Sequence, residues 1–283
     1  MTYSIIGFCP EREELGIAVQ SKFIGVGSVV PWAKAGVGAV ATQSYANPAY
    51  GPEGLALMEE GKSAEEALNI LIEADQGRAL RQVGIMDAKG RSATYTGEDC
   101  YDWAGGRKGK NCIAQGNILV SGETVDAMID CFENTEGKLA YRLLRALDAG
   151  QAAGGDKRGK QSAAIYVVKE KGGYLEANDR LIDLRVDEHP DPIKELLRIY
   201  RLHQLYFAGP LAEDVLEIGT DLQAEISGYL RQLDFLTVEN PGENDFYQAL
   251  TSFIRVENFE RRELDQGKID QAILQYMKEM ARK

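Results

Sequence analysis

The sequence predicts an α+β fold in which helices cover two antiparallel sheets, followed by a smaller, mostly helical part. Within the first 186 residues, pairs of strands alternate with pairs of helices, an order that favours layered sheets over a βαβ ladder. These residues hold 25 of the 30 glycines, so the composition changes after them. A chain of 283 residues corresponds to about two domains. We therefore predict domains at residues 1–188 and 189–283.

Strands and helices of the first part are predicted from hydrophobic periodicity and turn signals. The expected strands are 3–9, 14–23, 37–43, 81–87, 92–96, 112–120, 161–168 and 181–186. The expected helices are 54–60, 63–74, 123–133 and 138–149. The first two strands flank the polar loop 10–13 and form a hairpin. Ser63 and Glu66 form a capping box that would start the second helix.

The second part begins at residues 187–192, Asp-Glu-His-Pro-Asp-Pro. Two prolines favour extended geometry, so this stretch is either a linker or the start of a helix. Apolar residues at helical spacing predict helices at 192–207, 221–233, 246–254 and 272–280.

Charge and composition exclude several classes of function. The formal charge is −12, which argues against a phosphate-binding surface and hence against nucleic-acid partners. No apolar run approaches the roughly 20 residues that span a bilayer, and the start lacks a basic and apolar leader. We expect a cytoplasmic protein without a membrane partner.

Histidine and cysteine usage excludes further chemistry. The two histidines, His189 and His203, lie late in the chain and form no His-Glu-x-x-His pair. The four cysteines form no C-x-x-C pair, so neither zinc nor a disulfide framework is predicted. We expect no metal and no cofactor, and catalysis by imidazole is disfavoured.

Thr2 is the first candidate catalytic residue. Removal of Met1 is expected before a residue as small as threonine, and it would leave Thr2 with an α-amine at the start of a strand. An α-amine has a pKa near 7.7–8 and can act as the base for the hydroxyl of the same residue, without histidine. Threonine at position 2 is common, however, so an ordinary strand residue is the alternative.

Two further residues are candidates for a catalytic role. The predicted hairpin places Lys22 at the same sheet edge as Thr2, where an ammonium group would lower nearby pKa values and stabilise negative charge. A solvated surface lysine is the alternative. Asn117 follows a glycine on a strand, and its amide suits an oxyanion hole, although asparagines near turns are usually structural.

Polar residues at two strand ends are candidates for substrate binding. Residues 154–163 combine glycines, a basic turn and polar side chains that open an apolar strand, an arrangement suited to a carboxylate. Polar side chains also end the strand at 37–43. The six candidates are Thr42, Gln43, Asp156, Arg158, Gln161 and Ser162.

Seven segments of the first 200 residues match a known family: Met1–Ile5, Val19–Phe23, Val29–Ala33, Gly36–Gln43, Asn47–Gly51, Gln115–Asn117 and Gly155–Ala164. Through these segments, residues 1 to about 200 resemble the DUF1028 family of the N-terminal-nucleophile (Ntn) hydrolase superfamily. The resemblance implies a four-layer αββα sandwich and cleavage of a small amide or peptide bond. It also implies Thr2 as the nucleophile, with Lys22, Asn117 and Ser162 supporting it. Many superfamily members carry a propeptide, whereas exposure of Thr2 would depend on removal of Met1 alone.

The tail, from about residue 191, contains two recognisable segments, Phe253–Arg262 and Gly267–Leu274. Through them it resembles a small helical module described as peptidoglycan-binding. The resemblance implies a muropeptide as a further partner, whereas a helical appendage for homo-oligomer formation is the alternative. The competing hypothesis for the whole chain is a non-catalytic binding or assembly protein on a hydrolase scaffold.

Overall fold

The computed structural model describes residues 2–282 and divides the chain into two compact units, one up to Arg198 and one from Ile199. The predicted domain boundary after residue 188 precedes this division. Helix α5 (Pro192–Phe207) begins at the second proline of the junction, so this stretch is a helix start. Proline suits the first helical position because its missing N–H would lack an intrahelical partner anyway.

The first unit contains a six-stranded antiparallel sheet in the order β10-β9-β2-β1-β8-β7. Its strands are β1 (Thr2–Cys9), β2 (Glu14–Ser21), β7 (Gly105–Gly109), β8 (Cys112–Asn117), β9 (Ser162–Val168) and β10 (Arg180–Val186). The predicted hairpin is confirmed, with Tyr3 paired to Gln20 and Cys9 to Glu14. The strand expected at 112–120 ends earlier, because Ile118 has a positive φ of 50°.

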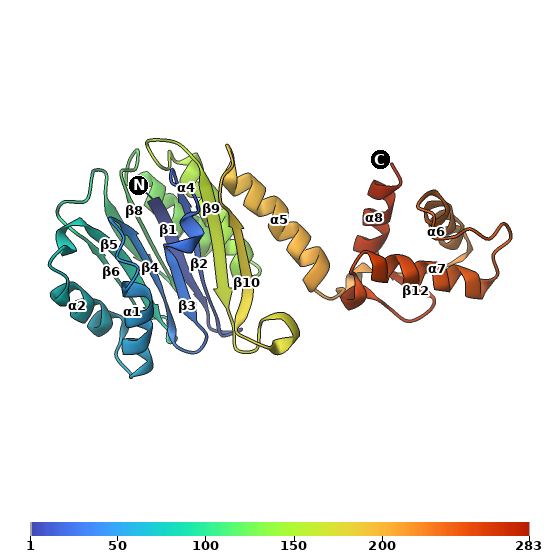
Figure 1. The fold of residues 1–283 in the computed structure, drawn as a ribbon, viewed down its shortest axis with the longest axis horizontal. Coiled ribbons are helices and arrows are strands. Elements are labelled where there is room, and N and C mark those ends of the chain that lie inside the picture. The colour runs from blue at the N-terminus through green and yellow to red at the C-terminus, as the bar shows by residue number, and fades with distance from the viewer. Residues whose placement is uncertain (1, 283) are drawn as a thin grey trace. The chain divides into compact units, whose positions relative to one another are not determined.

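A second, four-stranded sheet has the order β3-β4-β5-β6. Its strands are β3 (Pro31–Lys34), β4 (Gly38–Ser44), β5 (Arg81–Asp87) and β6 (Ser92–Thr96). Helices α1 (Tyr50–Glu59) and α2 (Ala64–Ala74) cover this sheet, and α3 (Glu123–Asn134) and α4 (Leu139–Ala152) cover the six-stranded one. The unit is therefore the αββα sandwich that the family resemblance implied (Figure 1). The predicted capping box at Ser63 is confirmed.

The space between the sheets is filled by side chains that alternate along each strand. Ile6 and Phe8 of β1 and Ile17 and Val19 of β2 pack there with Met86 of β5. Because β1 and β2 are in register, even-numbered residues of β1 share this face with odd-numbered residues of β2. The same alternation directs residues 2 and 4 of β1 and residue 21 of β2 into the space between the sheets.

The second unit has its own core. It consists of the end of α5 and helices α6 (Thr220–Gln232), α7 (Glu243–Val256) and α8 (Gln271–Met280), with the short pair β11 (Val215–Glu217) and β12 (Lys268–Asp270). Phe246, Phe253, Phe259 and Ile273 are among its fully buried side chains. The predicted helices are confirmed, whereas the two short strands were not predicted. Between residues 2 and 282, no helix is long and apolar enough to span a bilayer.

Candidate functional site

Thr2 lies at the first residue of β1, between the two sheets and only 6% exposed. Its hydroxyl oxygen is 3.0 Å from the Ser21 hydroxyl oxygen at the end of β2, and either group can be the donor. The hairpin thus brings the two strand ends together, as expected. Sequence reasoning missed Ser21, although the hairpin register placed it opposite Thr2. The expected removal of Met1 concerns a residue outside those described.

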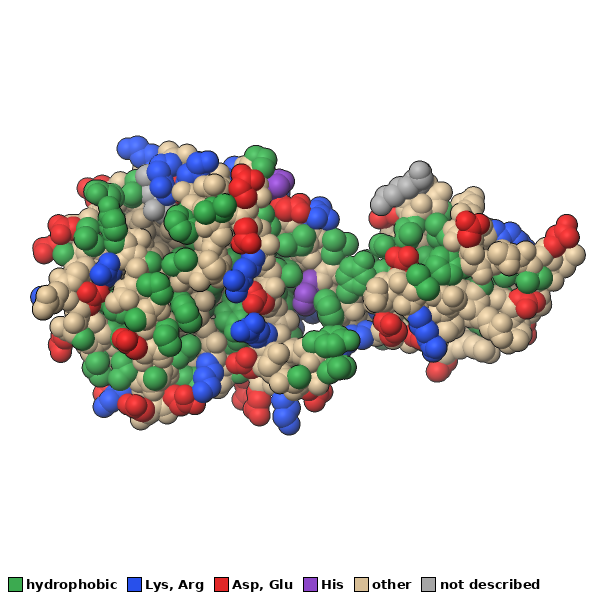
Figure 2. Space-filling model, in the orientation of Figure 1, with side chains coloured by type: hydrophobic (Ala, Val, Ile, Leu, Met, Phe, Trp, Pro, Cys, Tyr) green, Lys and Arg blue, Asp and Glu red, His purple; other side chains and the backbone are tan. Residues whose placement is uncertain are grey.

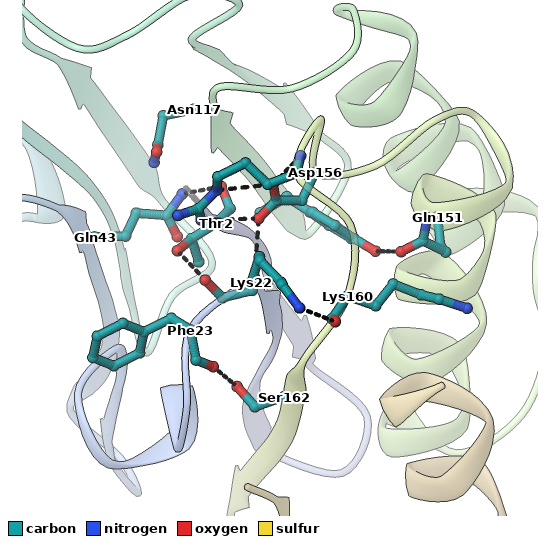
Figure 3. A network of polar contacts seen from close by, with 12 residues as sticks. Thr2, Lys22, Phe23, Gln43, Asn117, Gln151, Asp156, Lys160 and Ser162 are labelled. Carbon is teal, nitrogen blue, oxygen red and sulfur yellow. Dashed lines mark hydrogen bonds and ion pairs between the residues drawn. The ribbon is translucent and has the colours of Figure 1, made fainter. Parts of the chain in front are cut away.

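A network of buried amides joins Thr2 to both sheets. Figure 3 shows Thr2, Gln43 and Asn117 of this network. Thr2 pairs with Asn117 of β8, whose Nδ2 donates to Gln82 Oε1 at 2.9 Å. Gln43 Nε2 donates to the same oxygen at 2.8 Å and to the Thr2 carbonyl at 3.2 Å. Ser4 donates to Gln43 Oε1 at 2.7 Å. The predicted residues Asn117 and Gln43 therefore meet at Thr2, with Gln82 as an unpredicted hub.

Gln82 owes this place to strand pairing that the sequence does not reveal. It lies on β5 opposite Gln43 of β4, and its Nε2 reaches across to the Gly116 carbonyl on the other sheet at 2.8 Å. Its side chain is fully buried. The only signal in the sequence was a polar residue near the start of a strand whose centre is apolar.

Asp156 holds the loop beside the site. Its carboxylate accepts the backbone N–H groups of Lys22 and Arg158, each at 2.9 Å, and the Arg158 guanidinium bonds it as well. The carboxylate is fully buried, whereas the Arg158 side chain is 40% exposed. These contacts occupy both carboxylate oxygens, so Asp156 positions the loop. From the sequence, Asp156 was instead expected to contact the substrate.

The Lys22 ammonium group does not lie where the hairpin argument placed it. Its side chain is exposed, and Nζ donates to the Lys160 carbonyl at 3.4 Å. Figure 3 shows the side chain directed toward Lys160 rather than toward Thr2. Lys22 follows the last residue of β2, so its long side chain can leave the sheet and remain hydrated.

The remaining candidates are divided between the site and its surroundings. Ser162 pairs with Ser21, and its hydroxyl donates to the Phe23 carbonyl and accepts the Val26 N–H at 3.1 Å. Gln161 is half-buried and bonds the Ser21 carbonyl through its backbone N–H at 3.1 Å. Ser162 and Gln161 therefore lie beside the site.

Thr42 is separated from the site. It is the neighbour of Gln43 on β4, and successive side chains of a strand point to opposite faces. Its hydroxyl donates to the Asn47 carbonyl at 3.1 Å and supports the loop that follows β4. The prediction grouped Thr42 with Gln43, but strand alternation places only Gln43 between the sheets.

A second buried polar group lies on the helix-facing side of the same sheet. Tyr3 donates to Gln151 Oε1 at 3.1 Å, and burial, followed by the negative charge of Asp156, raises the pKa of its phenol. Its strand partner Gln20 is fully buried, and its amide atoms have no hydrogen-bond partner among residues 2–282. Hydrogen bonds therefore satisfy the amides between the sheets, whereas Gln20 behind them is unsatisfied.

Comparisons with known proteins agree with this architecture. Residues 2–196 match the DUF1028 model, described as a family of unknown function, and residues 206–277 match the model named "Putative peptidoglycan binding domain". A crystal structure of a DUF1028 protein from Silicibacter pomeroyi is 31% identical, with a TM-score of 0.66, over 72% of this chain and 89% of that one. No curated protein matches the chain.

Two structures of Anbu, the ancestral beta-subunit, are more distant. The protein from Yersinia bercovieri is 10% identical to this chain, and the match covers 94% of the Yersinia chain. The Gly-1 mutant from Hyphomicrobium sp. strain MC1 is 14% identical, and the match covers 96% of that chain. Each covers 72% of this chain with a TM-score of 0.33. The match over residues 2–196 and the Silicibacter pomeroyi structure show that the chain belongs to the DUF1028 family.

Proposed function

We propose that the protein is an amidohydrolase of the N-terminal-nucleophile type that cleaves a small amide or peptide bond with Thr2. The observation that carries the proposal is the position of Thr2. It is the first residue of a central strand, its hydroxyl lies 3.0 Å from Ser21 Oγ, and it meets the amide network at the end of the sandwich. The α-amine of Thr2 lies on the same residue as the hydroxyl and can act as its base without a histidine.

The reaction begins once Met1 has been removed. The α-amine of Thr2 takes the proton of its own hydroxyl, and Oγ1 attacks the carbonyl carbon of the substrate. Collapse of the tetrahedral intermediate breaks the C–N bond, and the ammonium group returns the proton to the departing nitrogen. The resulting ester on Thr2 is then attacked by water, which gives its proton to the amine. Cleavage of the ester releases the acid and restores the hydroxyl.

Two neighbours of Thr2 and one more distant charged group can assist this chemistry. Asn117 Nδ2 carries two hydrogens, of which Gln82 takes one, and the second is suited to stabilise the oxyanion. The Ser21 hydroxyl can both donate and accept, and can therefore orient Thr2 Oγ1 during proton transfer. Because the Lys22 ammonium group is directed away from Thr2, it would act only at a distance, through its positive charge.

The test combines mass spectrometry with turnover. We expect the native protein to have the intact mass of a chain that starts at Thr2. We also expect it to hydrolyse members of an amide and dipeptide library, Thr2→Ser to keep part of the activity, and Thr2→Ala to lose it. Thermal unfolding of the three proteins controls for folding. Equal turnover by wild type and Thr2→Ala would refute the proposal.

A second candidate function is the binding of peptidoglycan fragments by the second unit. A groove of about 350 Å³ runs along α7 and is lined by Asn244, Tyr247, Gln248, Thr251, Ser252, Arg255 and Gln266. Amides, hydroxyls and an aromatic ring suit a sugar that carries amide groups. Glu263 pairs with Arg255 at 3.1 Å, which favours an uncharged ligand portion there.

Titration of the full chain with a muropeptide tests this second candidate. We expect Gln248→Ala to weaken binding, whereas Val256→Ser, an exposed position on the same helix outside the groove, should leave binding unchanged. Binding that neither substitution alters would contradict the assignment to this groove.

A further inference from the structure

Large apolar side chains are exposed in the loops around Thr2. Phe23, Ile24, Tyr45, Tyr101 and Val120 are each 50–61% exposed, and we call these five residues the apolar rim. Exposed apolar groups that gather in one place commonly mark a binding surface. The core between the sheets is already filled, so folding alone does not account for the rim.

Strand topology brings the rim together at the Thr2 end of the sandwich. Phe23 and Ile24 follow Ser21 at the end of β2, Tyr45 follows the end of β4, and Val120 follows the end of β8. The Tyr101 carbonyl accepts the N–H of Ile118, the residue after Asn117. Four rim residues therefore lie within a few positions of a strand end that contributes to the site, and Tyr101 is hydrogen-bonded next to the end of β8.

Two rim residues are fixed by contacts with each other. The Tyr45 and Tyr101 hydroxyls are 3.5 Å apart, and their ring centroids are 6.4 Å apart. The Tyr45 carbonyl also accepts a hydrogen bond from Arg81, whose guanidinium pairs with Asp75 at 2.8 Å. This link joins the loop after β4 to the loop before β7, so this part of the rim is held in place before a ligand binds.

A basic group adjoins the rim. Lys157 is exposed and its backbone N–H donates to the Ile118 carbonyl at 3.1 Å, so the turn that carries it lies beside the loop of Val120. Arg158 and Lys160 of the same turn pair with Asp156 and Asp191. Lys157 forms no ion pair within the described part of the chain. Figure 2 shows basic and hydrophobic side chains together at the upper edge of the first unit, where β1 begins in Figure 1.

We propose that the substrate is an amphipathic amide, an N-acyl amino acid or short peptide with an aromatic or large apolar group and a free carboxylate. The apolar group packs on the rim, and the carboxylate pairs with Lys157. This inference rests on the proposed hydrolysis at Thr2 and names the class of substrate for that site. The charge on Lys157 and the exposed rings act as separate contacts, so each can be removed separately.

Binding to the full-length Thr2→Ala variant tests the inference without relying on turnover. The probes are N-phenylacetylglycine, N-acetylglycine, which lacks the ring, and N-phenylacetylglycinamide, which lacks the carboxylate. We expect calorimetry to show binding about tenfold weaker without the ring, and several-fold weaker without the carboxylate. Tyr45→Ser and Phe23→Ser should remove the preference for the ring, and Lys157→Gln the preference for the carboxylate.

Tyr174→Ser serves as the matched control. Tyr174 is 67% exposed but lies between β9 and β10, at the opposite end of the sheet, so its replacement should change neither preference. Equal binding of the three probes, no binding of any probe, or preferences that survive the rim substitutions would overturn the inference. If the preferences hold while wild type lacking Met1 cleaves none of the probes, the binding site stands and hydrolysis at Thr2 fails.

Discussion

The space between the two sheets differs from one end to the other, although the same strands line both ends. Toward the β1–β2 turn it holds apolar side chains, including Phe8, Leu15 and Ile17. At the start of β1 it holds hydroxyls and amides, including Thr2 and Gln82. Apolar packing is non-directional and tolerates small changes of shape, whereas buried amides need specific partners because an unpaired one costs free energy.

This difference indicates how the site is positioned. The polar end is built on strands, and its amides are hydrogen-bonded to one another and to backbone carbonyls of the six-stranded sheet. A buried network of mutual hydrogen bonds holds its members in one arrangement. The apolar end supplies stability, and the polar end supplies fixed positions around Thr2. Two substitutions between the sheets and two on the helix-facing side of the same strands test this account, from the largest expected effect to the smallest.

Replacement of Gln82, the shared acceptor of the amide network, should have the largest effect on stability. Gln82→Leu removes the acceptor of both Gln43 and Asn117. Each buried donor left unpaired costs about 1–3 kcal/mol, so we expect the free energy of unfolding to fall by roughly 2–6 kcal/mol in urea titrations. A loss below about 1 kcal/mol would show that the network is not needed to hold the polar end together.

Gln20→Leu should have the opposite sign. The Gln20 amide is buried on the helix-facing side without a partner among the described residues. Leucine has a similar volume and no polar atoms, so the substitution removes the unsatisfied amide. We expect a gain of about 1–3 kcal/mol in the same titration. A loss of stability would mean that water or a ligand pairs with this amide in solution.

A small cavity at the apolar end should have a moderate and purely structural effect. Ile17→Val should cost about 0.5–1.5 kcal/mol, because it removes one buried methyl group. Turnover per folded molecule and probe binding should equal those of wild type. A change in either would show that the two ends are coupled, against the division drawn above.

The smallest effect is expected at Glu14, where β2 begins, and it depends on pH. Burial raises the pKa of this carboxyl above its usual value. Below both its folded and unfolded pKa values the group is neutral in both states, and as pH rises through the folded pKa its charge becomes destabilising. Glu14→Gln should therefore be more stable than wild type at neutral pH, with the difference vanishing in acid. A difference independent of pH would contradict this account.

Local patterns predicted much of this molecule, because the elements follow from signals within a few residues of each other. The hairpin before Ser21 and the helix capped by Ser63 are examples. The strand Gly105–Gly109 was not predicted, because glycine and lysine rarely favour strands and only pairing with β8 stabilises it. In the candidate site, Thr2 and Asn117 were predicted from local features, and the structure places them on paired strands. Gln82 was missed because its role arises from pairing between strands distant in sequence.

The most direct test of the central claim is to locate the nucleophile chemically. Native protein would be treated with a β-lactone, which acylates activated hydroxyl groups, and the modified residue identified by peptide mapping with tandem mass spectrometry. We predict one ester, on Thr2 Oγ1 of chains that begin with Thr2, and none in Thr2→Ala. Acylation of Ser21 or Ser162 in place of Thr2, or an unmodified protein, would contradict the assignment of Thr2 as the nucleophile.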